Sequence, residues 1–220
     1  LHDALPIYFF KTNTDTEVIL AAFLRWGNDC LQRFNGMYAF AIWDTLEKKL
    51  TIARDRMGIK PLYYAYKDSA LVFASEIRAI IKSGLTDNKI SLRSVAEYLQ
   101  YTTVHAPNTI LQDVFMLMPG HVLEMQNRNV TITKYWDVNK FAVSKQDLSY
   151  KETCGKVNEL LTGAVERRLL ADVPFGAFLS GGIDSSAVVG FRSKGASEKV
   201  QTFNVSFEES EFSEAKYAKQ

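Results

Sequence analysis

The chain has 220 residues, of which 47% are hydrophobic, so it is long enough to bury one large core or two small ones. Its 26 basic and 25 acidic residues nearly cancel, which argues against nucleic acid or a membrane surface as the main partner. No apolar run is long enough for a transmembrane helix, and Cys30 and Cys154 have neither metal-binding nor redox spacing, so we expect a cytoplasmic protein with free thiols.

The first part of the chain predicts a layered α+β domain. Thr14-Asp15-Thr16-Glu17 reads as a capping box, and the helix that follows it ends at Gly27. Alternating and aromatic-rich runs predict strands at residues 37–44, 50–54, 61–66, 70–75, 121–126 and 130–136. Further helices are expected at residues 76–83 and 92–101, the second with Ser91 as its N-cap. Clustered strands beside segregated helices are typical of a layered α+β fold.

The second part predicts a parallel α/β arrangement after a polar linker at residues 138–148. Ser149-Tyr150-Lys151-Glu152 is a second capping box, and it opens an amphipathic helix that runs to about Leu170. A strand at 175–179, a helix at 185–192, a strand at 200–207 and a helix beginning near Ser213 follow. Two buried strands joined by a helix predict a right-handed βαβ unit, whose ligands bind at the carboxyl ends of the strands.

The turn between the first of these strands and its helix reads Ser180-Gly181-Gly182-Ile183-Asp184-Ser185-Ser186. A helix start favours anions, adjacent glycines let the backbone approach a phosphate closely, and the serines add hydroxyl donors. The turn has no Gly-Lys-Ser/Thr ending, no G-x-G-x-x-G pattern and no serine-hydrolase elbow. It therefore predicts a different kind of pyrophosphate loop, and the plain alternative is a serine-capped turn with no ligand.

This run resembles the pyrophosphate loop (PP-loop) of the ATP pyrophosphatases, Ser-Gly-Gly-x-Asp-Ser, and the preceding Asp172-Val173-Pro174-Phe175-Gly176 resembles the asparagine synthetase branch. The resemblance implies an adenine nucleotide α-hydrolase-like parallel sheet. It also implies ATP binding by Leu179, Ser180, Gly181, Gly182, Asp184, Ser185, Ser186 and Val205. Asp184 would hold Mg²⁺ through the pyrophosphate, whereas Leu179 and Val205 are almost equally well explained as core residues.

Runs in the first part resemble class II glutamine amidotransferases, which have an Ntn-hydrolase-like fold; they are residues 34–44, 53–64, 73–80 and 118–121. In the family, the aspartate matching Asp15 binds the α-amino group of glutamine. The alternative is an acidic residue that complements the helix dipole. Arg54 and Asp55 are expected to form an internal ion pair that stabilises the fold.

Together the two resemblances have the order of glutamine-hydrolysing asparagine synthetase, with residues 8–137 as the later part of the amidotransferase domain and 149–220 as the start of the synthetase domain. The family's nucleophile is an amino-terminal cysteine, but this chain begins with Leu1, and residues 1–7 fit no part of the pattern. We therefore expect an internal fragment that is inactive alone.

The expected parent is a ligase of asparagine biosynthesis that uses ATP, Mg²⁺, aspartate and glutamine. It would make asparagine, glutamate, AMP and pyrophosphate through β-aspartyl-AMP, with a homodimer as its candidate assembly and no nucleic-acid or membrane partner. Two alternatives remain open. One is a related amidotransferase-synthetase that amidates another carboxylate, and the other is a non-catalytic protein that retains the fold.

Overall fold

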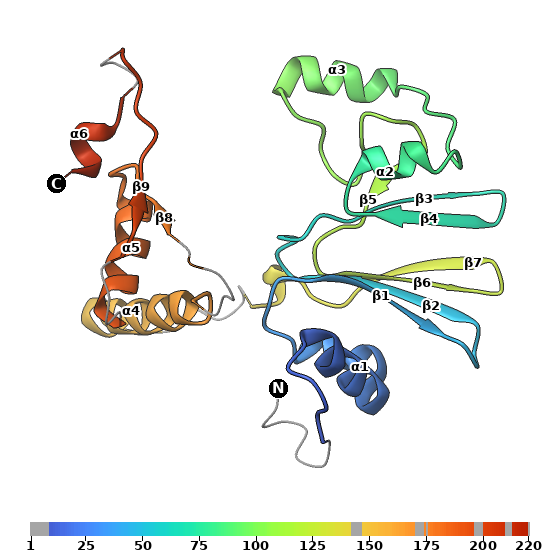
Figure 1. The fold of residues 1–220 in the computed structure, drawn as a ribbon, viewed down its shortest axis with the longest axis horizontal. Helices are drawn as coiled ribbons and strands as arrows, with labels where there is room; N and C mark the ends of the chain where they lie inside the picture. Colours follow the sequence, from blue (N-terminus) through green and yellow to red (C-terminus); the bar gives the residue numbers. More distant parts are fainter. Residues whose placement is uncertain are drawn as a thin grey trace. The chain divides into compact units, whose positions relative to one another are not determined.

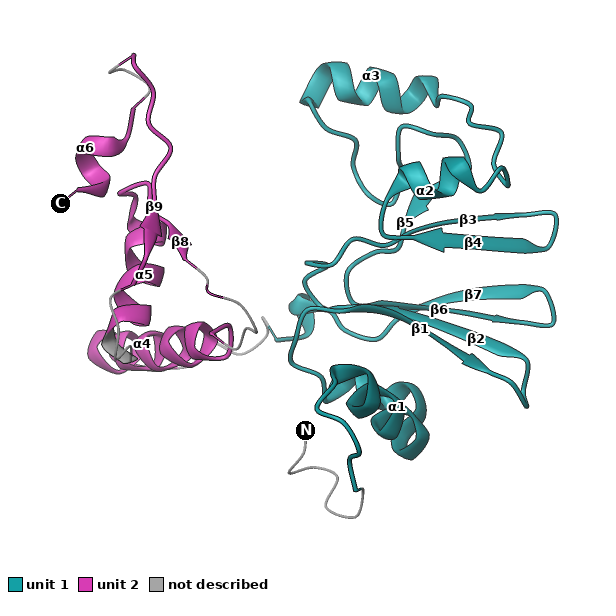
Figure 2. Cartoon of the chain, in the orientation of Figure 1, with its two compact units in different colours: residues 1–144 teal, residues 145–220 magenta. Residues whose placement is uncertain are grey.

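The computed structural model describes residues 9–141, 147–169, 174, 176–195, 200–209 and 213–219. The chain divides into two compact units, residues 1–144 and residues 145–220 (Figure 2). Within the described ranges, no helix combines the length and the apolar character that a membrane crossing needs.

The first unit contains two antiparallel sheets (Figure 1). One has the strand order β1-β2-β6-β7, formed by β1 (Ala39–Asp44), β2 (Lys49–Arg54), β6 (His121–Gln126) and β7 (Asn129–Lys134). The other has the order β4-β3-β5, formed by β3 (Tyr63–Lys67), β4 (Ala70–Ala74) and β5 (Phe115–Met116). The helical segments of this unit are α1 (Asp15–Trp26), η2 (Gly27–Gln32), α2 (Ile77–Lys82), α3 (Leu92–Tyr101) and η3 (Val138–Phe141).

Three apolar clusters bind these elements into layers. The first joins α1 and η2 to the four-stranded sheet and includes Leu31 and Ala53. The second lies between the two sheets and includes Ile52 and Leu123. The third joins the three-stranded sheet to α2 through Ile80. Ile52 and Ala53 are neighbours on β2 and enter different clusters because successive strand residues face opposite sides. The predicted layered α+β fold is confirmed, in the order helix, sheet, sheet, helix.

The caps of the first two long helices agree with the sequence in part. Thr14 caps α1 by accepting from the backbone N–H of Glu17, and Ser91 caps α3 as predicted. However, the Glu17 carboxylate does not return to the N-cap. It accepts from the backbone N–H groups of Lys11 and Thr12, at 2.9 and 2.7 Å. The predicted capping box at α1 is therefore only half formed, because the preceding chain curls back over the helix start.

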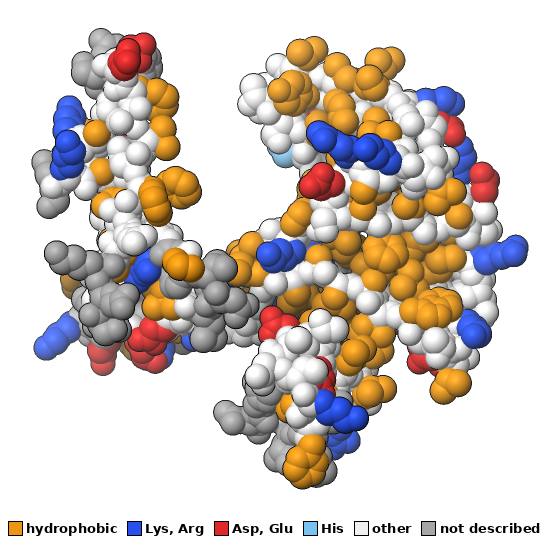
Figure 3. All heavy atoms as spheres, viewed as in Figure 1, with side chains coloured by type: hydrophobic (Ala, Val, Ile, Leu, Met, Phe, Trp, Pro, Cys, Tyr) orange, Lys and Arg blue, Asp and Glu red, His pale blue; other side chains and the backbone are white. Residues whose placement is uncertain are grey.

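The α3 helix contributes little to the core despite its apolar residues. Ser94 is the buried residue of this helix, while Leu92 and Leu99 are exposed. Figure 3 shows apolar side chains at the surface over this helix.

The second unit consists of α4 (Tyr150–Glu166), β8 (Ala177–Phe178), α5 (Ile183–Gly195), β9 (Thr202–Phe203) and α6 (Ala215–Ala218). The capping box at Ser149 is complete, as predicted. β8 and β9 pair in parallel, and α5 lies between them in the chain. This confirms the parallel pairing of the predicted βαβ unit. Leu170 and Phe175, where a helix was expected to end and a strand to begin, lie outside the described residues.

The prediction that these two strands are buried is wrong. Each is only two residues long, and Phe178 and Phe203 are 78% and 54% exposed. A two-stranded sheet this short has too little surface of its own to cover large side chains.

The two cysteines are free thiols in different surroundings. Cys30 on η2 is buried, and its desolvation raises the pKa of the thiol to about 11. Cys154 on α4 is exposed.

Candidate functional site

The turn between β8 and α5 is tight and requires glycine at one position. β8 ends at Phe178 and α5 begins at Ile183, so four residues reverse the chain. Gly181 has φ +82°, a conformation that side-chain-bearing residues rarely adopt. A Cβ there would also lie 2.4 Å from the Cβ and 2.6 Å from the carbonyl carbon of Tyr217. Both the backbone conformation and the close approach of α6 therefore demand glycine.

Serine hydroxyls hold this turn together from inside. The hydroxyls of Ser180 and Ser185 are 3.0 Å apart, and the Ser185 hydroxyl accepts from the Ser180 N–H at 3.3 Å. The Ser185 hydroxyl also donates to the Gly182 carbonyl at 3.2 Å. The Ser186 N–H donates to the same carbonyl at 3.0 Å and makes the first backbone bond of α5. Ser180 and Ser185 thus build the turn, while the Ser186 hydroxyl has no partner among the described residues.

Part of the loop remains available to an anion. The Ser180 and Gly182 N–H groups already donate to serine hydroxyls, at the long distances of 3.3 and 3.4 Å. Over the described ranges of the chain, the N–H groups of Gly181, Ile183, Asp184 and Ser185 have no acceptor. These four donors stand at the positive end of a 13-residue helix, where a phosphate is stabilised by both hydrogen bonds and the helix dipole.

A hollow of about 330 Å³ opens beside the loop, at the carboxyl ends of the parallel strands. It is lined by Leu179, Thr202, Asn204, Ser206, Ala215, Ala218 and Lys219. Its volume is at the lower end of the range for small-molecule sites, so it would take part of a nucleotide rather than all of one.

The lining differs from the sequence prediction at one strand. Leu179 lines the hollow, but Val205 does not and is 62% exposed. Thr202, Asn204 and Ser206 line it instead, since alternate residues of an extended segment share a face. The predicted contact of Val205 with a nucleotide stays a prediction. The period-two pattern of polar residues was the signal that would have indicated the other three.

Asp15 is the first residue of α1, and its carboxylate is exposed with no hydrogen-bond or ion-pair partner in the described part of the chain. It is therefore free to bind an ammonium group and also complements the helix dipole. Its role in glutamine binding stays a prediction.

The predicted ion pair between Arg54 and Asp55 is wrong, although both residues are structural. Arg54 donates to the carbonyls of Lys60, Leu117 and Gly58, at 2.8, 2.5 and 2.7 Å. Asp55 accepts from three backbone N–H groups of the same turn. Neighbouring residues at a strand end point to opposite sides, so the Arg54 and Asp55 side chains each bind the backbone instead of each other. Burial lowers the pKa of the Arg54 guanidinium.

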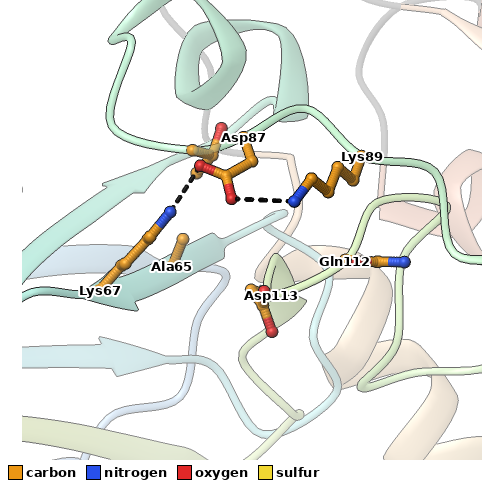
Figure 4. Close-up of a pocket in the computed structure, with 7 residues that line it drawn as sticks. Ala65, Lys67, Asp87, Lys89, Gln112 and Asp113 are labelled. Carbon is orange, nitrogen blue, oxygen red and sulfur yellow. Dashed lines mark hydrogen bonds and ion pairs between the residues drawn. The ribbon is translucent and has the colours of Figure 1, made fainter.

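A second hollow, near Lys67, Asp87 and Lys89, does not have the character of a ligand site (Figure 4). Its volume is about 10 Å³, room for about one water molecule. Asp87 pairs there with Lys67 at 2.5 Å and with Lys89 at 3.6 Å, and all three side chains are substantially exposed. Exposed pairs of this kind add little stability. The described residues also contain no group of three His, Cys, Asp or Glu side chains that could hold a metal ion.

Comparison with known proteins identifies the family of the first unit. The family model described as "Glutamine amidotransferase domain" matches residues 3–136. The chain belongs to this glutamine amidotransferase family. A second model, described as "Asparagine synthase", matches residues 156–220 of this amidotransferase-family chain.

The alignments with two curated relatives extend over both units of the chain. The chain is 33% identical over 207 residues to "Asparagine synthetase [glutamine-hydrolyzing] 3" of Bacillus subtilis, covering 92% of this chain and 33% of the relative. It is 35% identical over 214 residues to "Putative asparagine synthetase [glutamine-hydrolyzing] 2" of Methanocaldococcus jannaschii, covering 95% and 41%. The chain thus spans less than half the length of these two relatives.

Among solved structures, the chain is similar to the glutamine phosphoribosylpyrophosphate amidotransferase of B. subtilis complexed with ADP and GMP. The TM-score is 0.44 at 17% identity, covering 87% of this chain and 39% of that one.

Proposed function

We propose that this chain is part of a glutamine-dependent asparagine synthetase and that its second unit binds ATP at the loop between β8 and α5. The observation that carries the proposal is the set of four N–H groups, at Gly181, Ile183, Asp184 and Ser185, that have no acceptor among the described residues and lie beside a hollow at the strand ends. The named relatives and the second family match support the choice of reaction.

The proposed reaction joins two half-reactions. The side-chain carboxylate of aspartate attacks the α-phosphorus of ATP, forming β-aspartyl-AMP and releasing pyrophosphate. Ammonia from glutamine then attacks the activated carbonyl, giving asparagine and AMP, while glutamate is the product of the amidotransferase half. The loop would stabilise the charge that develops on the leaving pyrophosphate, through the helix start and the Ser186 hydroxyl. Asp15 would bind the α-amino group of glutamine.

Asp184 suits magnesium bound to phosphate oxygens. Its carboxylate is exposed in the first turn of α5 and has no partner among the residues described. Magnesium at nucleotide sites needs only one or two carboxylates in addition to the phosphates. When bound, the metal would offset the negative charge of the triphosphate.

The test is calorimetric titration of the chain with Mg·ATP and with pyrophosphate, and we expect the two to compete. Ser186→Ala should weaken both by about three- to tenfold, the effect of one lost hydrogen bond. Ser193→Ala is the matched control, because Ser193 lies farther along α5 and its hydroxyl donates to the Gly190 carbonyl of the same helix. If the chain binds neither Mg·ATP nor pyrophosphate, the proposal fails and a non-catalytic protein with the retained fold becomes the better account.

The acceptor is tested in the parent protein by measuring glutamine-dependent amidation of aspartate against other carboxylates. Formation of asparagine supports the proposal, and amidation of another carboxylate with none of aspartate replaces it by the related amidotransferase-synthetase. The homodimeric assembly and the cytoplasmic location stay predictions.

A further inference from the structure

The two parallel strands of the second unit separate just before the loop. Backbone bonds run from Ala177 N–H to Gln201 O at 3.0 Å and from Leu179 N–H to Phe203 O at 2.8 Å. In a regular parallel ladder the next bond would join Val205 N–H to Leu179 O. That carbonyl instead accepts from the side-chain amide of Asn204, Nδ2, at 2.8 Å. A side chain thus replaces the backbone where the strands diverge.

The bond from Asn204 acts on the first peptide of the loop. The carbonyl of Leu179 and the N–H of Ser180 belong to one planar peptide, so fixing one fixes the direction of the other. The Ser180 N–H donates to the Ser185 hydroxyl, which donates to the Gly182 carbonyl. The relay therefore runs from Asn204, the residue after β9, to the start of α5. Linked hydrogen bonds of this kind strengthen one another.

We propose that Asn204 is a positioning residue for the phosphate loop, which it orients through the peptide between Leu179 and Ser180. The inference rests on the proposed function, since it assumes that the loop binds phosphate. Asn204 acts through the loop rather than by touching phosphate. Its loss therefore weakens every ligand that the loop holds, including pyrophosphate, which lacks the nucleoside.

The decisive variant is Asn204→Asp, which keeps the shape of the side chain but replaces the amide donor by an acceptor facing the Leu179 carbonyl. We expect Mg·ATP and pyrophosphate each to bind about three- to tenfold more weakly, the range for one hydrogen bond. Asn158→Asp, at an exposed position of α4, introduces the same charge away from the loop and should change neither affinity. Circular dichroism confirms that both variants are folded.

Two results would overturn the inference while leaving the proposed function intact. One is unchanged affinity of Asn204→Asp for both ligands. The other is weaker binding of Mg·ATP with unchanged binding of pyrophosphate, which would mean direct contact with the nucleoside.

A ligand-free measurement separates the two proposals. Amide hydrogen exchange at Ser180, Gly182 and Ser186, whose N–H groups donate within the loop, should be about three- to tenfold faster in Asn204→Asp than in Asn158→Asp. If the wild-type chain binds no phosphate ligand, the proposed function fails. The positioning role then fails as well, because there is no bound phosphate to position. In that case, faster exchange in Asn204→Asp would show only that the hydrogen-bond relay from Asn204 exists. Equal exchange in the two variants would also overturn the inference.

Discussion

Replacing Asp55 with asparagine removes one acceptor from a turn enclosed in the first unit. Asp55 is 1% exposed, and its carboxylate accepts from the N–H groups of Met57 and Ile59 at Oδ1, at 3.1 and 3.0 Å, and of Lys60 at Oδ2, at 3.0 Å. Asparagine can keep the two bonds at Oδ1, but its NH₂ group then faces the Lys60 N–H. The variant loses one charge-assisted bond and leaves two buried donors opposed. We expect a destabilisation of about 3 kcal/mol.

The assay is urea unfolding followed by tryptophan fluorescence. The three tryptophans, Trp26, Trp43 and Trp136, all lie in the first unit, so the signal reports that unit. With a slope of about 1–3 kcal/mol per molar urea, the midpoint should fall by about 1–3 M.

Asp44→Asn is the matched control. Asp44 accepts from Leu46 and Glu47, both at Oδ1, so asparagine can retain both bonds in this hairpin turn. The control should change stability by less than about 0.5 kcal/mol. Equal midpoints for the Asp55 and Asp44 variants would refute the view that the buried carboxylate organises the turn.

Three further substitutions test other features. Gly120→Ala should destabilise the first unit by about 1–3 kcal/mol in the same fluorescence assay, because the new Cβ would lie 2.6 Å from the Trp136 carbonyl oxygen. Gly181→Ala should weaken Mg·ATP binding at least about tenfold in calorimetry, since it forces the turn out of its left-handed conformation; unchanged affinity would contradict the geometry. The hydrogen bond from His105 lowers the pKa of Glu97 below its ordinary 4.5. His105→Ala should therefore reduce the free energy of unfolding by its full amount at pH values above 4.5, where Glu97 is ionised in both the folded and the unfolded chain. The difference in unfolding free energy should vanish as the pH falls through the lowered pKa, and a difference that persists in acid would exclude this pair as its source.

The local sequence was enough to predict the loop, but not the hydrogen bond from Asn204 that orients its first peptide. The run from Ser180 to Ser186 predicts a strand, a glycine turn and a helix, because each step depends on neighbours in the chain. The contact of Asn204 with Leu179 spans 25 residues and depends on where two strands part, which no local pattern encodes. The same limit explains the exposure of Phe178, because burial depends on what covers a strand rather than on the strand itself.

In the first unit, the sequence predicted the layers well but misjudged one pair of side chains. Its layers follow from alternating apolar residues, and the predicted bounds of β6 and α3 agree with the structure at both ends. The error over Arg54 and Asp55 came from treating adjacent opposite charges as partners. Strand geometry turns such neighbours apart, and the backbone of the turn then satisfies each of them.

The contrast between the two thiols makes one of them a selective point of attachment. Cys30 is enclosed and holds its proton tightly, so a maleimide dye at neutral pH should react with Cys154 alone. The dye would then sit on α4, while the indole donors sit in the other unit. Energy transfer between them would report how far apart the two units lie in solution, and whether ATP or glutamine changes that distance.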